Sequence, residues 1–398
     1  MSSTSSSEPS QPLTLSGLDR ARAFVDAVLS LNRLAKERWG EEPLTANSTD
    51  VVPTLQTLDQ VDDRLAEIER ELPLLDTAAR AYLGPVLKAL RCVTRILQGD
   101  AIPYLEQVAT IQEIQLAPAP PEEGEALRAE LAELLGRRGY RSGDLAADVA
   151  RWVEDTRLTG EALREKARQV IARSKAETLE KVVTLPPEDS TDVAFTEGVY
   201  WSAYSRYQGD YRGIITLNAD RPWTEAGVAH VMCHEGYPGH QAFYCLWDYL
   251  YRQGQWPMEA AFYFTNQPHN ALFEGAPENG LHFLGWDQEE EFRLASVQNQ
   301  LQKVGNIGAC YFLNHEGMER EEAIRYMCEV GLVPRRQAEL NYRFMTNPMQ
   351  RTYYPAYYYG EKIVRAAYEA VPDHRRFFQL LYYQPQTVST LKAAVGLP

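Results

Sequence analysis

Apolar side chains recur at helical spacing along most of the chain. Within residues 15–39 they include Phe24, Val25 and Val28, so they lie three or four positions apart or side by side on one helical face. Asp76 precedes another such segment and is expected to cap it, because its carboxylate can accept hydrogen bonds from first-turn amides. The same spacing predicts further helices over residues 58–71, 77–97 and 101–115.

A proline-rich run at residues 117–121 interrupts these helices and predicts an extended connector. Residues 122–182 then return to helical spacing in three pieces, with charged outer faces typical of a solvated bundle. Residues 182–187 form a short apolar run that ends in two prolines. This run is interpreted as either a strand or an extended crossing.

The pattern changes again at residues 212–218, where β-branched side chains dominate and predict a β-strand. A helix is expected to follow from Trp223 and to continue past an interruption to about Tyr251. Helices then resume after Pro257, including a long amphipathic one over residues 289–313. The predicted fold class is therefore mainly α, a large helical body with a small β element beside one helix.

Composition narrows the class of protein. The formal net charge of -15, from 40 basic and 55 acidic residues, argues against nucleic acid or an anionic membrane as a partner. Five cysteines without paired spacing indicate reduced thiols, and no apolar run is long enough to span a membrane. Residues 1–14 are expected to be a disordered tail without a signal-peptide pattern. These features predict a cytoplasmic protein, and they leave its oligomeric state open.

The helix after the predicted strand carries two imidazoles and a carboxylate within seven residues, at His234, Glu235 and His240. A His-Glu pair followed by a second His is typical of zinc hydrolases. Here the two histidines are six positions apart, which places them about 240° apart around a regular helix. Pro238 and Gly239 lie between them and predict a bulge or kink that turns His240 back toward His234. We favour metal ligation over a solvated helix face, because breaking a buried helix costs roughly 3 kcal/mol.

A catalytic zinc site needs a third protein ligand. Glu274 is the favoured candidate, because its apolar surroundings would make an unpaired carboxylate costly; the alternative is a capping or salt-bridged glutamate. Glu278 and His282 follow it at i+4 and i+8, on one helical face if Pro277 lies in the first turn. They are candidates for supporting the ligands, for contacting the substrate or for replacing a ligand. Glu235 is then the expected general base.

Further residues are candidates for binding the substrate. Arg343 lies on an aromatic helix face, where it could clamp a carboxylate or form a salt bridge. The tyrosine-rich run near the C-terminus is more typical of core packing, but Tyr354 or Tyr357 could donate a hydrogen bond to an oxyanion. His315 repeats the letters His-Glu-Gly without a second His and is assigned to substrate contact. An edge strand could align an extended substrate through its main chain, which nominates Ile215, Leu217 and Asn218.

The segment from His234 to His240 resembles the His-Glu-x-x-Pro-Gly-His signature of the bacterial family called domain of unknown function 885. Further blocks of that family have similar counterparts in the same order over roughly residues 195–365. They are residues 213–218, 273–276, 315–323, 342–350 and 357–360. The family is similar to the gluzincins, which are helical zinc peptidases.

The resemblance implies a zincin-related body in which His234, His240 and Glu274 hold the metal. It also implies that Glu235 is the base and that Tyr357 donates to the transition state. The sequence departs from the family after Glu274, where Glu-Gly-Trp-Ala-Leu-Tyr-Ala-Glu is replaced by Glu-Gly-Ala-Pro-Glu-Asn-Gly-Leu. Three extra residues before the last block make Tyr354 a competitor of Tyr357.

The function that we expect is metal-dependent hydrolysis of an amide bond in a peptide or a peptide-like small molecule. One divalent metal ion is expected, zinc foremost, with iron or manganese as alternatives. The N-terminal helical region, residues 15–190, and the catalytic region, residues 191–398, are expected to form one body around a cleft. A non-hydrolytic metalloenzyme, with iron, acting on a small specialised metabolite is one alternative. A non-catalytic binding module derived from a peptidase is the other.

Overall fold

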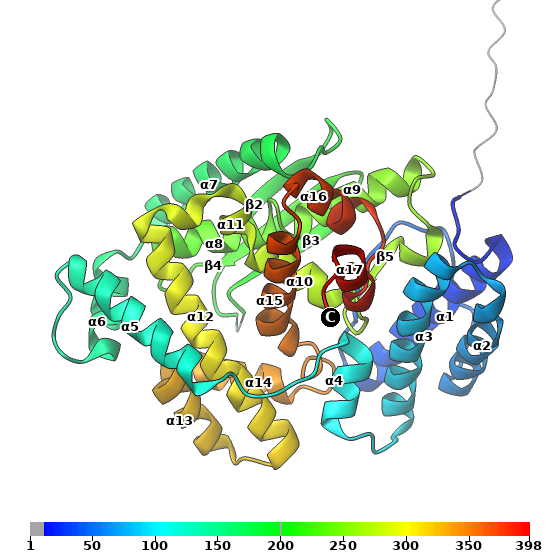
Figure 1. Cartoon of the computed structure of the whole chain (residues 1–398), viewed down its shortest axis with the longest axis horizontal. Coiled ribbons are helices and arrows are strands. Elements are labelled where there is room, and N and C mark those ends of the chain that lie inside the picture. The colour runs from blue at the N-terminus through cyan, green and yellow to red at the C-terminus, as the bar shows by residue number, and fades with distance from the viewer. Residues whose placement is uncertain (1–11, 200) are drawn as a thin grey trace, which may run out of the picture.

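A computed structural model describes residues 12–199 and 201–398, and it is mainly helical with two small sheets (Figure 1). Most of the tail predicted over residues 1–14 lies outside the described residues. At its end the carbonyl of Leu13 accepts a hydrogen bond from the amide of Met258 at 2.8 Å. The helices of the first half are α1 (Leu18–Trp39), α2 (Leu58–Glu71), α3 (Thr77–Gln98), α4 (Tyr104–Gln112), α5 (Pro121–Arg137), α6 (Leu145–Asp155) and α7 (Gly160–Lys181).

The second half begins with the three-stranded sheet and continues almost entirely as helix. The strands of the whole chain are β1 (Leu44–Asn47), which lies in the first half, and β2 (Ser190–Thr196), β3 (Ala203–Gly209), β4 (Arg212–Asn218) and β5 (Phe262–Phe264). The helices are α8 (Glu225–Glu235), α9 (His240–Arg252), α10 (Asn270–Glu278), α11 (Gly280–Leu284), α12 (Glu290–Tyr311), α13 (Arg320–Gly331), α14 (Arg335–Thr346), α15 (Pro355–Ala370), α16 (His374–Tyr383) and α17 (Val388–Val395). A π-helical turn, Phe312–Glu316, extends α12, and single 3-10 turns lie at Leu72–Leu74, Met258–Ala260 and Trp286–Gln288.

The N-terminal helices form where the apolar spacing predicts them. The carboxylate of Asp76 accepts a hydrogen bond from the amide of Ala79 at 2.9 Å, so the predicted cap of α3 is confirmed. Residues 113–120 contain no helix or strand, and Figure 1 shows them running from α4 to α5 as an extended connector. In the described part of the chain no helix is long and apolar enough to cross a membrane.

The larger sheet has the strand order β2-β4-β3, with β4 in the centre. β4 pairs in parallel with β2, where Ser190 faces Arg212, and antiparallel with β3, where Ala203 faces Leu217. β4 has the predicted bounds. β2 and β3 were not predicted from the sequence, and their side chains are largely half-buried or exposed. Residues 182–187 form no strand, so the extended crossing is the correct interpretation of that run.

One hydrophobic core joins the two halves of the chain. The second sheet pairs β1 from the first half with β5 from the second half, and the ring of Phe24 packs against Phe262 at 6.1 Å. Near the middle of the molecule, α10 lies directly on α15 (Figure 1). A Cβ added at Gly275 of α10 would lie 2.1 Å from the carbonyl oxygen of Gly360 of α15, so glycine allows the two backbones to touch. This contact brings the tyrosines at the start of α15 toward Glu274.

Candidate metal centre

The two histidines of the motif stand on two different helices. α8 begins at a cap in which the hydroxyl of Thr224 accepts a hydrogen bond from the amide of Gly227, and it ends at Glu235. α9 begins with His240, and residues 236–239 form an irregular turn between the helices. The rings of His234 and His240 lie 4.7 Å apart between centroids. The prediction that the segment around Pro238 and Gly239 turns His240 back toward His234 is therefore confirmed.

Glycine is required in this turn. A Cβ added at Gly239 would lie 1.8 Å from the carbonyl oxygen of His234 and 2.4 Å from that of Cys233. The hydroxyl of Tyr382, on α16, donates to the carbonyl of Pro238 at 2.7 Å, and the Tyr237–Pro238 peptide bond is cis. The turn is thus folded tightly against the last residues of α8.

Glu274 of α10 meets both histidines. Its Oε2 atom lies 3.3 Å from Nε2 of His234, and its Oε1 atom lies 3.4 Å from Nε2 of His240. One ligand atom from each of the three residues lies within 4.8 Å of the other two. All three side chains are buried, with 10%, 10% and 1% of their surface exposed. The structure therefore brings together the three residues that the sequence nominated as metal ligands.

The donor set suits a tetrahedral ion. Two atoms that each lie about 2.0–2.1 Å from one tetrahedral zinc are separated by about 3.3–3.4 Å. Oε2 of Glu274 lies at this distance from Nε2 of His234, and the other carboxylate oxygen, Oε1, lies 3.4 Å from Nε2 of His240. Oε2 of Glu274 is also buried without a hydrogen-bond partner among the described residues, which is costly for a carboxylate unless a cation is bound.

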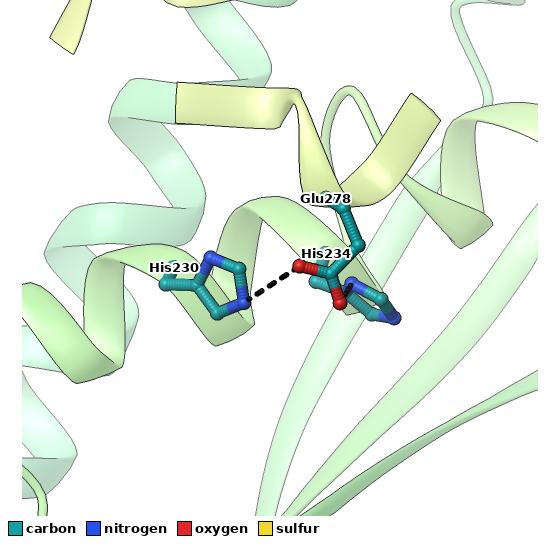
Figure 2. Close-up of side chains that lie close together, drawn as sticks. All are labelled: His230, His234 and Glu278. Carbon is teal, nitrogen blue, oxygen red and sulfur yellow. Dashed lines mark ion pairs between the residues drawn. The ribbon is translucent and has the colours of Figure 1, made fainter. Parts of the chain in front are cut away.

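A second group of possible ligands contains His230, His234 and Glu278. Figure 2 shows the carboxylate of Glu278 between the two imidazoles, 3.5 Å from Nε2 of His230 and 3.4 Å from Nδ1 of His234. The ammonium group of Lys303 pairs with the same carboxylate and, at 2.6 Å, with that of Glu361. A metal ion here would meet a fixed positive charge. We therefore assign Glu278 to orienting His234 by its charge, because Nδ1 of His234 has this ion pair but no hydrogen-bond partner among the described residues.

Negative charge dominates the centre. Burial lowers the pKa of His234, but the carboxylates of Glu274, Glu278 and Glu235 outweigh burial and raise it to about 9. Burial lowers the pKa of His240 to about 4. The carboxylates act to raise both pKa values, but at His240 burial and the charge of His234 outweigh them.

Glu235 ends α8 beside β3. Burial raises the pKa of Glu235 to about 7, and the nearby backbone of Ser205 on β3 partly offsets this effect. The carboxylate is close enough to Tyr357 to contribute to raising the pKa of that hydroxyl. This position places an ionisable carboxylate next to the ligand His234, between the sheet and the tyrosines of α15.

The tyrosines near the start of α15 lie in different surroundings. Tyr353 donates a hydrogen bond to Oε1 of Glu274, and its ring packs against that of Tyr357 with 5.6 Å between centroids. The ring of Tyr357 lies 6.3 Å from that of His234. Tyr354 instead packs against Phe344. The structure therefore favours Tyr357 over Tyr354 as the tyrosine at the centre, and it adds Tyr353, which the sequence analysis missed.

The prediction that β4 is an edge strand is wrong. Both of its sides are paired, and the side chains of Ile215 and Leu217 are fully buried in the core. The side-chain amide of Asn218 donates hydrogen bonds to the carbonyls of Val199 and Trp201, so Asn218 closes the loop between β2 and β3. Because its main-chain groups are used within the sheet, β4 cannot align a substrate. The outer strand on the side of Glu235 is β3.

Three other candidates lie outside the ligand cluster. Pro277 is in the last turn of α10 and not in the first, and a break at Asn279 ends the helical face that was expected to include His282. His282 instead bonds to Asp287, with 2.6 Å between Nδ1 and Oδ2. His315 is exposed in the π-helical turn and packs on Tyr311. Arg343 is exposed on α14 and forms no ion pair in the described residues.

Comparison with known proteins supports the fold only. No family model and no curated protein matches the chain. A putative lipoprotein from Colwellia psychrerythraea has a similar structure, with a TM-score of 0.59 and 15% identity over 92% of this chain and 68% of that one. A putative lipoprotein of unknown function from Shewanella oneidensis has a TM-score of 0.54 and 14% identity over 86% of this chain and 74% of that one. At this identity the likeness concerns the arrangement of the helices and strands.

Proposed function

We propose that this chain is a divalent-metal-dependent hydrolase that cleaves an amide bond in a peptide or a peptide-like small molecule. The observation that carries the proposal is the meeting of His234, His240 and Glu274, which each place one ligand atom within 4.8 Å of the others in a buried cluster. Two imidazoles and one carboxylate are the protein ligands of many hydrolytic zinc sites. The sequence resemblance to the domain of unknown function 885 family supports the same proposal.

The three residues would hold one ion, with zinc the best match to the donor set. When bound, such an ion polarises a carbonyl group and lowers the pKa of water toward about 7. The proton transfers are assigned to a side chain of the protein. Glu235 takes the proton of the attacking water and passes it to the leaving amine, which is the role of a general base beside a ligand.

Tyr357 is the proposed donor to the oxygen that becomes negative during the attack, because its ring lies beside His234. Its ring packs against that of Tyr353, whose hydroxyl binds Glu274. An extended substrate would be aligned by β3, which is an edge strand among the described residues and passes close to Glu235 at Ser205.

Metal content and activity together test the proposal. Protein purified without added metal, or reconstituted with zinc, should contain one equivalent and hydrolyse members of a peptide library. Glu235→Gln should lower the rate at least about 100-fold with metal content unchanged. His240→Ala should lose the metal, whereas His269→Ala, which removes an equally buried histidine outside the cluster, should retain it.

Two results would contradict the proposal. Full activity in Glu235→Gln would show that Glu235 is not the base and that the mechanism is wrong. Less than about a tenth of an equivalent of any transition metal, with no gain on reconstitution, would favour a binding module without a metal.

A further inference from the structure

Asp189 lies directly before β2 and is fully buried, with 0% of its side chain exposed. Its Oδ2 atom accepts a hydrogen bond from the hydroxyl of Tyr237 at 2.6 Å and pairs with Nζ of Lys175 at 2.7 Å. Its Oδ1 atom accepts a hydrogen bond from Nε2 of Gln241 at 3.0 Å. A buried carboxylate is stable only when such partners compensate for lost hydration, and here both oxygens have them.

Two of these partners bracket a proposed metal ligand. Tyr237 lies in the turn between α8 and α9, and Gln241 directly follows His240. The carboxylate therefore joins the turn to the first residues of α9. The hydroxyl of Tyr237 also contacts that of Thr191 on β2, at 2.7 Å, so the same tyrosine is tied to the sheet.

The sheet leaves room for this contact. A Cβ added at Gly213 of β4 would lie 2.0 Å from Oε1 of Gln241, so the glycine lets Gln241 rest directly on the strand. Nε2 of Gln241 also lies 3.4 Å from the carbonyl of Tyr211. The start of α9 is thus fixed against both β4 and Asp189.

We infer that Asp189 is a positioning residue for the metal centre, which holds the Tyr237–His240 turn so that His240 faces His234. This inference rests on the proposed function, because it concerns the same metal site. Asp189 acts through Tyr237 and Gln241 and touches neither the ligand atoms nor Glu235. Groups that orient metal ligands typically contribute 10–100-fold to metal affinity, so the effect can be measured on binding.

The chain offers a matched control on the same helix. Asp248 of α9 is almost fully buried, accepts a hydrogen bond from the hydroxyl of Tyr207 at 2.6 Å, and pairs with Arg252 at 3.0 Å. It lies two turns beyond His240, away from the Tyr237–His240 turn. Tyr237→Phe and Tyr207→Phe therefore each remove one hydroxyl that binds a buried aspartate, but only Tyr237 lies in the turn.

The experiment compares Asp189→Asn and Tyr237→Phe with Asp248→Asn and Tyr207→Phe. Zinc affinity is measured by competition with a chromophoric chelator, and the visible spectrum of the cobalt(II)-substituted protein reports ligand geometry. Hydrogen exchange of residues 236–242 is measured on metal-free protein. Asp189→Asn and Tyr237→Phe should weaken zinc binding at least about 10-fold, alter the cobalt spectrum and speed exchange in the turn. The Asp248 and Tyr207 variants should keep wild-type zinc affinity and spectrum.

The outcomes separate this inference from the proposed function. A wild-type protein that binds no metal overturns both. A wild type that binds zinc, with Tyr237→Phe and Asp189→Asn of unchanged affinity and spectrum, overturns the role of Asp189 alone. The role of Asp189 is also overturned if all four variants weaken zinc binding equally, because the effect would then be a general loss of stability.

Discussion

Lys303 should be one of the most sensitive residues of the chain for stability. Its ammonium group is buried on α12, with 9% of the side chain exposed, between the carboxylates of Glu278 and Glu361, which are 5% and 12% exposed. Burial lowers the pKa of Lys303, but the two carboxylates outweigh it and raise the pKa above its ordinary value. Lys303→Met keeps most of the packing and leaves two buried negative charges without their shared partner.

The magnitude follows from this arrangement. Removing one partner of a buried ion pair costs about 3–5 kcal/mol, because the remaining charge stays buried. The unfolding entropy of a chain of 398 residues, at about 2.1 cal/mol/K for each residue, is about 0.8 kcal/mol/K. The expected fall in melting temperature is therefore about 4–6 °C.

The assay is differential scanning calorimetry at a fixed scan rate. Arg293→Met is the control, because Arg293 pairs with Glu130 where the two side chains are 40% and 36% exposed. Such a pair contributes at most about 1 kcal/mol, or about 1 °C here. Adding Glu361→Gln to Lys303→Met should recover part of the loss, since it removes one of the two unpaired charges.

A small effect would refute the reasoning. If Lys303→Met melts within about 1 °C of the wild type, or no lower than Arg293→Met, then Lys303 does not neutralise buried carboxylates. The assignment of Glu278 to orienting His234, in place of binding a second ion, would then lose its basis.

Two other predictions concern the turn and the pH dependence of stability. Gly239→Ala should abolish zinc binding and lower the melting temperature, because its Cβ would lie 1.8 Å from the carbonyl oxygen of His234. Gly124→Ala in α5 is the control and should stabilise the protein by about 0.5–1 kcal/mol, because its Cβ would meet only a Val304 methyl group at 3.5 Å. Wild-type zinc affinity in Gly239→Ala would contradict this prediction. Burial raises the pKa of Asp287, but the hydrogen bond and charge of His282 outweigh it and hold the pKa below its ordinary value. A depressed pKa contributes stability above the unfolded value of about 3.9 that is lost as pH falls through the folded value. Urea unfolding should therefore show Asp287→Asn less stable than the wild type at neutral pH, with the gap narrowing below about pH 4; a constant gap would contradict this.

The sequence alone determined what depends on neighbouring residues. Apolar side chains at helical spacing predicted α1 to α7 closely, because one apolar face is enough to specify a helix that packs on a core. The β-branched run of β4 gave the right bounds for the same kind of reason. The spacing of the two histidines around Pro238 and Gly239 also predicted a break in the helix, since a regular helix would point them apart.

Only the tertiary structure decided which of these residues meet and what else joins them. The central place of β4 depends on β2 and β3, whose mixed composition gives little strand signal. Tyr353 reaches Glu274 across 79 positions of sequence because two glycines let α10 touch α15. Spacing within one segment cannot reveal such contacts.

Charge compensation was equally invisible in the sequence. In the sequence, Lys303 is an ordinary lysine of an amphipathic helix. Only the packing of α12 in the fold places it between Glu278 and Glu361. Asp189 lies 48 positions before Tyr237 and binds it only because β2 lies beside the turn. A buried charge needs its partner from whichever segment packs against it, so the long-range packing of the fold selects these residues, whereas the local pattern of the chain selects the helices and the metal-binding motif.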